Sequence, residues 1–558
     1  MLHDRFTREA IFLRENRIGT VCQVGPSQVR FIAGGVANGS SAHSLGEYLV
    51  IDCGTLAVIG QLTDMSSDNG RGNGEAQTLG QITLLTTLHF SDGSVVPGVI
   101  TSPQIGSEIY RASAKLITYV LDSGAELRGV KLARGQDAVT LSFAKLADRD
   151  RTPIAITPEQ LFGSHCAIIG SSGGGKSWTI ARLIQECSQY RSKVILLDPS
   201  GEFETLTDNT KHVYIGTDPL PGEGAVEVVL PYYELTEMDL FAIFRPEGQS
   251  QAPKLRAAME SLKLARLEPM MAPDGTILKA DRSKIEFLKA LRYHLAAIEH
   301  PLADFDITKL SRQIVNECVH PNRSAVEPQY WGGINGSDQA QCMFLVTRID
   351  DIIKSRSLAP LFQPSGKPSL FAEIDQFLTT DTHRVLRIAL QYLSTSHHAR
   401  EIVANAIGRY VFELAKEGKF RDHPLLVVVD EAHRFLNERL NDRTLLFPLD
   451  AFASIAKEGR KYAINICLST QRPQDIPEDV LSQVGSMIVH RIISDQDLRV
   501  VERASGALDK SSSISLPRLV PGEAVIIGMA FPVPLNILVD YPDHPPNSRG
   551  PDFQRCWR

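Results

Sequence analysis

The segment Gly170-Ser-Ser-Gly-Gly-Gly-Lys-Ser177 decides the fold of this 558-residue chain. Residues 165–169, just before it, are mostly apolar and β-branched, as expected for a buried strand of a parallel sheet. Residues 178–184, just after it, have apolar side chains at helical spacing. A strand, a glycine-rich turn and a helix N-terminus together surround a polyphosphate with backbone N–H groups. The sequence therefore predicts a nucleoside triphosphate site.

The residues of this loop have distinct expected roles. Lys176 is long enough to reach the β- and γ-phosphates, and the Ser177 hydroxyl can ligate Mg²⁺. The other members supply backbone N–H groups and the first turn of the helix. The predicted nucleotide-binding residues are Gly170, Ser171, Ser172, Gly173, Gly174, Gly175, Lys176, Ser177 and Trp178.

Length and composition limit the remaining possibilities. The chain is too long for one ordinary domain, and 43% hydrophobic with 22% charged residues describes a soluble globular protein. A net charge of −7 argues against wrapping nucleic acid over the whole surface, so any DNA contact needs a local basic patch. The eight cysteines are scattered without a C-x-x-C pair, which predicts free thiols. Without a signal core or a long apolar run, we expect a cytoplasmic protein with no membrane contact.

The N-terminal part, residues 1–150, is β-rich. Short apolar segments alternate with turn clusters, which predicts a small β-barrel or sandwich. Residues 66–75 form a polar, glycine-rich loop in this interpretation. Arg128, Lys131 and Arg134 either face a partner or belong to a solvated barrel surface. The expected strands are 18–24, 47–51 and 56–60.

From residue 151 the pattern changes to alternating strands and helices. This alternation predicts an α/β core with a parallel sheet covered by helices, in two parts, 151–231 and 371–510. Residues 232–370 between them have helical periodicity and form an insertion, and 511–558 hold a last strand pair and an extended tail. The expected core strands are 166–169, 193–197, 385–390, 425–429 and 463–468, and the tail strands are 524–527 and 535–539.

Within the insertion, two segments have clear helical spacing, 254–266 and 285–298. The loop 322–337 contains Trp331-Gly-Gly-Ile-Asn-Gly336, which is too rich in glycine for the interior of a helix or strand.

An acidic pair follows one of the predicted buried strands, in Leu426-Val-Val-Val-Asp-Glu-Ala-His433. Carboxylates at the C-terminal tip of such a strand are placed to bind Mg²⁺ and to activate water. We expect Asp430 to hold the water shell of the metal and Glu431 to polarise the attacking water. The alternative is a helix N-cap formed by an acidic pair.

Two more polar residues follow predicted strands. Gln471, after strand 463–468, would lie between the phosphate loop and the acidic strand as a γ-phosphate sensor, or it belongs to a simple strand-end turn. Asp198, which opens Asp198-Pro-Ser-Gly-Glu202, either lines the same cleft or caps a turn.

Arg460 follows a helix that we expect to end at Gly459. A guanidinium on an exposed loop can enter the site of a neighbouring subunit and neutralise transition-state charge. The alternative is a cation that complements the C-terminus of a helix.

Taken in order, these motifs carry a family resemblance. The approach at 153–162, the phosphate loop, Asp198-Pro-Ser-Gly-Glu-Phe203, the acidic strand and Glu458-Gly-Arg-Lys-Tyr462 with Leu468-Ser-Thr-Gln-Arg-Pro473 resemble the HerA family, in its bacterial form. This family belongs to the FtsK–HerA class of RecA-like ATPases. The barrel resembles the small barrel of that family, and 521–525 resembles its C-terminal segment. The phosphate loop departs from the family pattern, with Ser172 where threonine is common.

The resemblance implies a RecA-like core and a hexameric ring that hydrolyses ATP with Mg²⁺ and passes double-stranded DNA through a central pore. It also implies a nuclease partner, or a Sir2-like effector of the kind found beside bacterial relatives in anti-phage systems. Carried onto this chain, it makes Glu431 the catalytic base, Gln471 the sensor and Arg460 a finger acting across subunits.

Two functions of different classes follow from these expectations. The first is an ATP-driven motor that translocates or unwinds DNA, in anti-phage defence or DNA end processing, where Arg434, Arg439 and Arg443 either line the pore or form a solvated helix face. The second is an ATP-gated ring scaffold that activates a partner effector with little translocation. A metabolic enzyme is disfavoured because no residues for a second substrate are evident.

Overall fold

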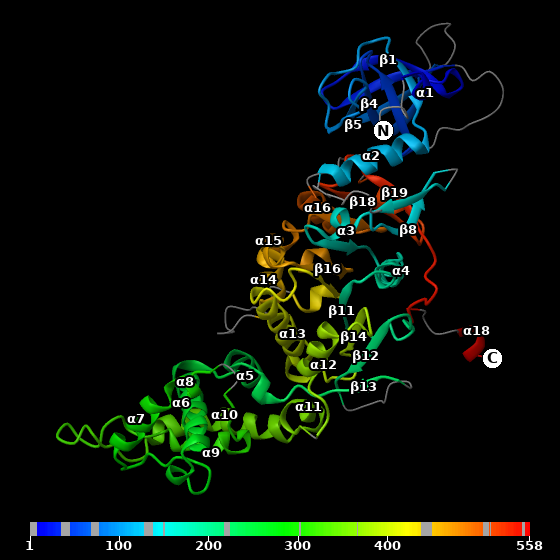
Figure 1. Ribbon diagram of the computed structural model, residues 1–558. Helices are drawn as coiled ribbons and strands as arrows, with labels where there is room; N and C mark the ends of the chain where they lie inside the picture. The colour runs from blue at the N-terminus through cyan, green and yellow to red at the C-terminus, as the bar shows by residue number, and fades with distance from the viewer. Residues whose placement is uncertain are drawn as a thin grey trace.

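The computed structural model describes residues 8–34, 45–68, 77–127, 138–148, 151–216, 224–300, 303–364, 366–436, 449–505, 513, 515–548 and 553–557. Three parts follow one another along an elongated molecule (Figure 1). The blue β-barrel lies at one end, an α/β core occupies the middle, and the green helical insertion extends at the other end. The red C-terminal segment runs back along the core.

The N-terminal part is a closed barrel. Its strands have the order β2-β1-β7-β3-β4-β5-β6, and an additional β2–β5 pairing closes six of them. Phe31 fills the interior, and the approach is so close that a Cβ on Gly80 would lie 2.2 Å from its ring. The strands are β1 (Arg17–Val24), β2 (Gln28–Ala33), β3 (Tyr48–Asp52), β4 (Leu56–Asp68), β5 (Gln77–His89), β6 (Val95–Pro97) and β7 (Glu108–Arg111), flanked by α1 (Arg8–Ile11) and α2 (Ala114–Leu127).

The barrel corrects one expectation about its loops. Residues 66–68, which we expected to begin a glycine-rich loop, continue strand β4 and pair with β5. Backbone pairing with a neighbouring strand overrides the turn propensity of these serines. The remainder of that loop, 69–75, lies outside the described residues, as do Arg128, Lys131 and Arg134.

The core is built on a sheet with the order β13-β12-β14-β11-β15-β16-β10-β17-β18-β19-β8-β9. Pairing is parallel from β13 to β17 and antiparallel from β17 to β9. The strands are β8 (Leu141–Leu146), β9 (Pro153–Ile156), β10 (Cys166–Ile169), β11 (Lys193–Asp198), β12 (Thr210–Tyr214), β13 (Val226–Glu227), β14 (Val385–Ala389), β15 (Leu425–Val429), β16 (Ile464–Thr470), β17 (Ser486–Val489), β18 (Glu523–Gly528) and β19 (Leu535–Val539). The expected parallel sheet covered by helices is confirmed.

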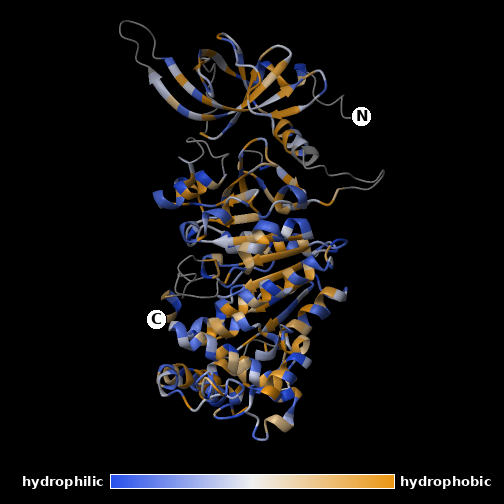
Figure 2. Cartoon of the chain, turned by 90° about the vertical axis from the view of Figure 1, so that its left-hand side faces the viewer, coloured by the Kyte–Doolittle hydropathy of each residue, from blue (hydrophilic) through white to orange (hydrophobic). Residues whose placement is uncertain are grey.

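Both faces of this sheet are buried, which explains the continuous apolar runs of its strands. In β11, Ile195 and Leu197 join the cluster that contains the insertion, whereas Val194 and Leu196 join the cluster beneath α4. Figure 2 shows apolar residues concentrated along these strands. The expected boundary at residue 150 falls between β8 and β9, two strands that pair with each other at this sheet's edge.

Helices cover the sheet on both sides. Those of the core are α3 (Pro158–Phe162), α4 (Lys176–Ser188), α12 (Leu370–Thr379), α13 (Ala399–Lys416), α14 (Ala451–Glu458), α15 (Glu478–Leu481) and α16 (Asp495–Ser505), and the tail carries α18 (Phe553–Cys556). The eight cysteines are free, and Cys556 is exposed. Within the described ranges, no helix combines the length and the hydropathy needed to cross a bilayer.

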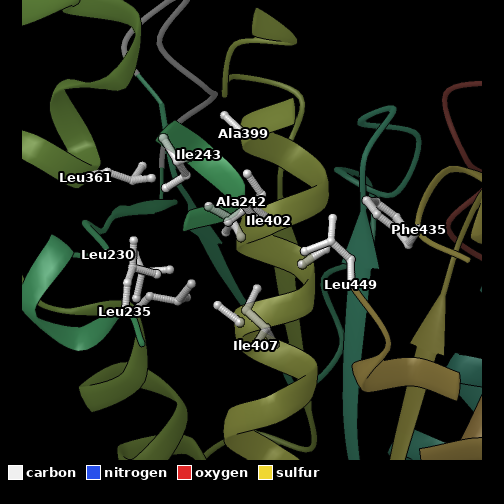
Figure 3. Close-up of a cluster of buried hydrophobic side chains, with 14 of the residues drawn as sticks. Leu230, Leu235, Ala242, Ile243, Leu361, Ala399, Ile402, Ile407, Phe435 and Leu449 are labelled. Atoms are coloured by element: carbon white, nitrogen blue, oxygen red, sulfur yellow. The ribbon is translucent and has the colours of Figure 1, made fainter. Parts of the chain in front are cut away.

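The insertion packs against the core through α13. Ile402 and Ile407 of this helix face Leu235 and Ile243 of the insertion side within one buried cluster (Figure 3). One expected helix, 285–298, is divided at His294, whose backbone leaves helical geometry. The helices of this part are α5 (Glu237–Phe244), α6 (Gly248–Leu267), α7 (Lys284–Tyr293), α8 (Leu295–Ile298), α9 (Leu310–Asn316), α10 (Gly336–Lys354) and α11 (Ala359–Phe362).

Candidate active site

The phosphate loop lies at the carboxyl end of β10, and α4 begins with Lys176. Gly175, the N-cap of α4, has φ 115°, a backbone conformation that side-chain-bearing residues rarely adopt. At Gly170, a Cβ would lie 2.6 Å from the Cβ of His490, so only glycine lets the loop sit on β17's end. These two glycines therefore allow the loop to pack closely against the end of β17 before α4 begins.

Sheet order brings the acidic strand and the loop together through Gln471. Strand β16 pairs with β10 on one side and β15 on the other, so its carboxyl end emerges between them. Gln471 Nε2 donates to Glu431 Oε1 at 2.5 Å, and the Ser172 hydroxyl donates to Gln471 Oε1. One side chain therefore connects the expected base to the phosphate loop.

Glu431 occupies a strained position. Its φ is 47°, in the left-handed region that costs a non-glycine residue about 1 kcal/mol or more. The side chain is buried, and His433 Nδ1 lies 3.2 Å from its Oε2. Burial lowers the pKa of His433, which disfavours the charged form of the ring beside Glu431. This conformation is of the kind that persists where the surrounding structure fixes it for function.

Asp430 is buried beside other carboxylates. Burial, followed by the charges of Asp198, Glu431 and Glu202, raises the pKa of Asp430 to about 8. The Ser200 hydroxyl donates to its Oδ2 at 3.3 Å. A cation beside this group would relieve that repulsion, so the donor set of carboxylates and hydroxyls fits Mg²⁺.

Lys176 faces the same carboxylates. Its side chain is buried, and Nζ donates to the Ser171 carbonyl oxygen at 3.1 Å. Burial lowers the pKa of Lys176, and the charges of Glu431, Asp430 and Glu202 oppose that effect. The ammonium group is therefore held at the cavity between the loop and the acidic strand.

Asp198 caps a turn, which settles the alternatives that its sequence left open. Its carboxylate accepts backbone N–H bonds from Gly201, Glu202 and Phe203 at 2.6–3.2 Å. It also pairs with Arg387 at 2.7 Å, and both side chains are buried.

That turn positions Glu202, a residue that sequence reasoning missed. Glu202 lines the cavity together with Ser177. Burial raises the pKa of Glu202. The only signal in the sequence was its place in Asp198-Pro-Ser-Gly-Glu202, whose first residue was the predicted polar group.

A cavity of about 760 Å³ is lined by the phosphate loop, Glu202 and Gln471. Its described lining includes the predicted residues Trp178 and Gln471. It also includes seven residues of the C-terminal segment that the sequence did not predict. Lining residues are Ser172, Gly173, Gly175, Lys176, Ser177, Trp178, Glu202, Gln471, Pro521, Gly522, Leu538, Val539, Asp540, Tyr541 and Ser548. The volume is sufficient for a nucleotide.

Arg460 lies at the amino end of the central strands, opposite the end that carries the phosphate loop. It precedes β16, while Gln471 follows that strand, and the seven residues of β16 span about 20 Å. Burial, with a smaller effect of the Arg460 charge, lowers the pKa of His165, the residue before β10. The side chain of Arg460 is exposed. Arg434 is also exposed, and Arg439 and Arg443 lie outside the described residues.

Comparisons with known proteins identify the family of this chain. A family model described as the central domain of helicase HerA matches residues 141–305. A DNA double-strand break repair helicase HerA of Sulfolobus acidocaldarius is 30% identical over 401 residues, which cover 71% of this chain and 68% of that protein. The chain belongs to the HerA family. As a HerA-family protein with a complete phosphate loop, it is an ATPase.

Two further relatives are archaeal. A probable helicase of Methanocaldococcus jannaschii is 23% identical over 78% of this HerA-family chain and 71% of its own length. A probable DNA double-strand break repair helicase HerA of the same organism is 25% identical over 72% of this chain and 76% of its own. Among solved structures, VirB4 of Thermoanaerobacter pseudethanolicus aligns with a TM-score of 0.43 at 14% identity, over 73% of this chain and 97% of VirB4.

Proposed function

We propose that this HerA-family chain is the subunit of a hexameric motor that hydrolyses ATP to translocate or unwind double-stranded DNA. The observation that carries the proposal is the hydrogen-bonded chain from Glu431 through Gln471 to Ser172. A sensor that touches both the base and the phosphate loop can couple the state of the nucleotide to the geometry of the water-activating group.

The site would hold ATP with Mg²⁺. Ser177 and Asp430 would hold the metal, which neutralises phosphate charge when bound. Lys176 binds the β- and γ-phosphates, and Glu431 accepts the proton of the attacking water. Gln471 fixes the Glu431 carboxylate toward that water.

Arg460 completes the site of another subunit. The roughly 20 Å span of β16 prevents this guanidinium from reaching the cavity of its own chain. This exposed arginine, at the amino end of the strands, would reach the nucleotide site of the neighbouring subunit in a ring. There it would neutralise charge that develops on the γ-phosphate. This arrangement supports a closed ring of head-to-tail contacts, which we propose is a hexamer.

DNA is the proposed track. The relatives are named as helicases of double-strand break repair. With a net charge of −7, the chain would hold DNA through a local basic lining of the pore. Arg434, exposed beside the acidic strand, supports such a lining. A nuclease or Sir2-like effector would use the ring in DNA end processing or anti-phage defence.

The test measures ATP turnover with and without linear double-stranded DNA, together with displacement of a triplex-forming strand from that DNA. The motor predicts turnover stimulated by DNA and displacement that requires ATP, both lost in Glu431→Gln. Turnover that ignores DNA and changes when a co-purifying protein is added would instead support the ATP-gated scaffold and overturn the motor.

A further inference from the structure

The C-terminal segment forms one wall of the nucleotide cavity. We call residues 540–548, which follow β19, the strap. The strap begins with Asp540, whose backbone N–H donates to the Phe143 carbonyl oxygen at 2.9 Å. Two residues past Tyr541, the Asp543 N–H donates to Gln185 Oε1 of α4 at 3.0 Å. Tyr541 is therefore fixed from both sides.

The far end of the strap is tied to the segment that carries Glu202. The Thr205 hydroxyl donates to the Pro545 carbonyl oxygen at 2.8 Å. The Asn547 N–H donates to the Glu202 carbonyl oxygen at 2.7 Å. These bonds hold the strap in register with the phosphate site, although more than 300 residues separate the two in the sequence.

Two aromatic rings meet where the strap crosses α4. The rings of Trp178 and Tyr541 have centroids 4.2 Å apart and planes at 86°, and both side chains line the cavity. Trp178 directly follows Ser177, so this aromatic corner lies just past the phosphate end of the site. Tyr541 remains 71% exposed, so its ring is accessible to a ligand in the cavity.

We propose that the nucleobase of the bound nucleotide stacks in this corner, so that Tyr541 of the strap is a base-binding residue. The inference rests on the proposed function, because the phosphates must lie in the loop. Because the two ring planes are nearly perpendicular, Tyr541 can stack against the face of the base while Trp178 contacts its edge. Leu538 and Pro521 add apolar wall, and the Asp540 carboxylate nearby is held by Lys145 at 3.0 Å.

Recognition by ring faces does not distinguish purines. Every base has a π-face, so stacking tolerates base identity. The loss of Tyr541 should therefore weaken adenine and guanine nucleotides by the same factor. It should leave the binding of a ligand that has phosphates but no base unchanged.

The test is calorimetric titration of the full chain with ATP, GTP and inorganic tripolyphosphate, each with Mg²⁺. Tyr541→Ala should weaken ATP and GTP alike by roughly ten- to a hundredfold, the range for loss of one aromatic–base stack. Tripolyphosphate should bind as in wild type. Tyr541→Phe, which keeps the ring, should restore the affinity, and Tyr293→Ala on the distant helix α7 should change nothing.

Lys176→Ala separates the two proposals. It should weaken all three ligands, including tripolyphosphate. If Tyr541→Ala binds ATP as tightly as wild type while Lys176→Ala does not, the base-binding role is wrong and the ATP site stands. An equal loss of tripolyphosphate in Tyr541→Ala would also overturn the inference, because it would show a displaced strap. Unchanged ATP affinity in Lys176→Ala would overturn both.

Discussion

Replacing Gln471 by alanine should slow hydrolysis without preventing nucleotide binding. The amide donates to the Glu431 carboxylate at 2.5 Å and accepts from the Ser172 hydroxyl. A hydrogen bond to a charged group contributes about 1.5–3 kcal/mol, and about 1.4 kcal/mol corresponds to a factor of ten in rate. If this contribution is made in the transition state, kcat should fall about ten- to a hundredfold.

The assay is single-turnover ATP hydrolysis, combined with a titration of nucleotide binding on the same preparation. The Kd for ATP should change less than about threefold, because the phosphate loop, including Lys176, remains. Ser172→Ala removes only the neutral hydrogen bond and should cost about fivefold. Gln474→Ala, three residues downstream and exposed, is the matched control and should leave kcat unchanged. A Gln471→Ala enzyme with wild-type kcat, or one whose whole loss lies in binding, would refute the coupling of base and loop through this amide.

Two further predictions concern stability. Burial lowers the pKa of His165 and of His490 to about 4, below the usual value near 6.5, so the unfolded chain takes up protons first as the pH falls. The contribution of these two histidines to stability should be level above pH 6.5 and fall between about pH 6.5 and 4, by up to roughly 3 kcal/mol per histidine. His490→Asn should remove its share of this pH dependence, measured as the difference from wild type in pH-dependent melting, and an unchanged difference across that range would contradict the assignment. Arg387→Met leaves Asp198 buried without its cation and should cost about 3 kcal/mol or more, measured as faster hydrogen exchange in β11 and β14. The exposed pair of Arg312 is the control, and Arg312→Met should cost less than about 1 kcal/mol, whereas equal effects of the two substitutions would count against a buried-charge penalty.

The sequence predicted the five core strands β10, β11, β14, β15 and β16, which carry long buried apolar runs or stand next to a motif. The bounds of β10 and β15 agree with the expected 166–169 and 425–429, because an uninterrupted apolar run ends where burial ends. Strand β12, Thr210–Tyr214, was not predicted because it mixes polar residues with two buried ones. Strand β17 was not predicted because, unlike the equally short β10, it is not followed by a motif that marks it as a strand.

The part of the site that was missed depends on contacts between distant segments. Glu202 lines the cavity with Ser177 only because Asp198 accepts three N–H bonds and folds the turn. Tyr541 meets Trp178 only because β18 and β19 extend the sheet beyond β17 and return the chain to α4. No spacing in the sequence indicates either meeting, since both are set by tertiary pairing.

The measurement that tests the central claim most directly is ATP turnover in mixtures of two inactive variants. Glu431→Gln lacks the base, and Arg460→Ala lacks the finger, so neither should turn over ATP alone. In randomly mixed rings at equal amounts, a site is complete when an Arg460→Ala subunit receives the arginine of a Glu431→Gln neighbour, which occurs at about a quarter of the interfaces. We predict recovery to roughly that share of wild-type turnover. No recovery at any mixing ratio, in rings shown to exchange subunits, would contradict a site completed by a second copy of the chain.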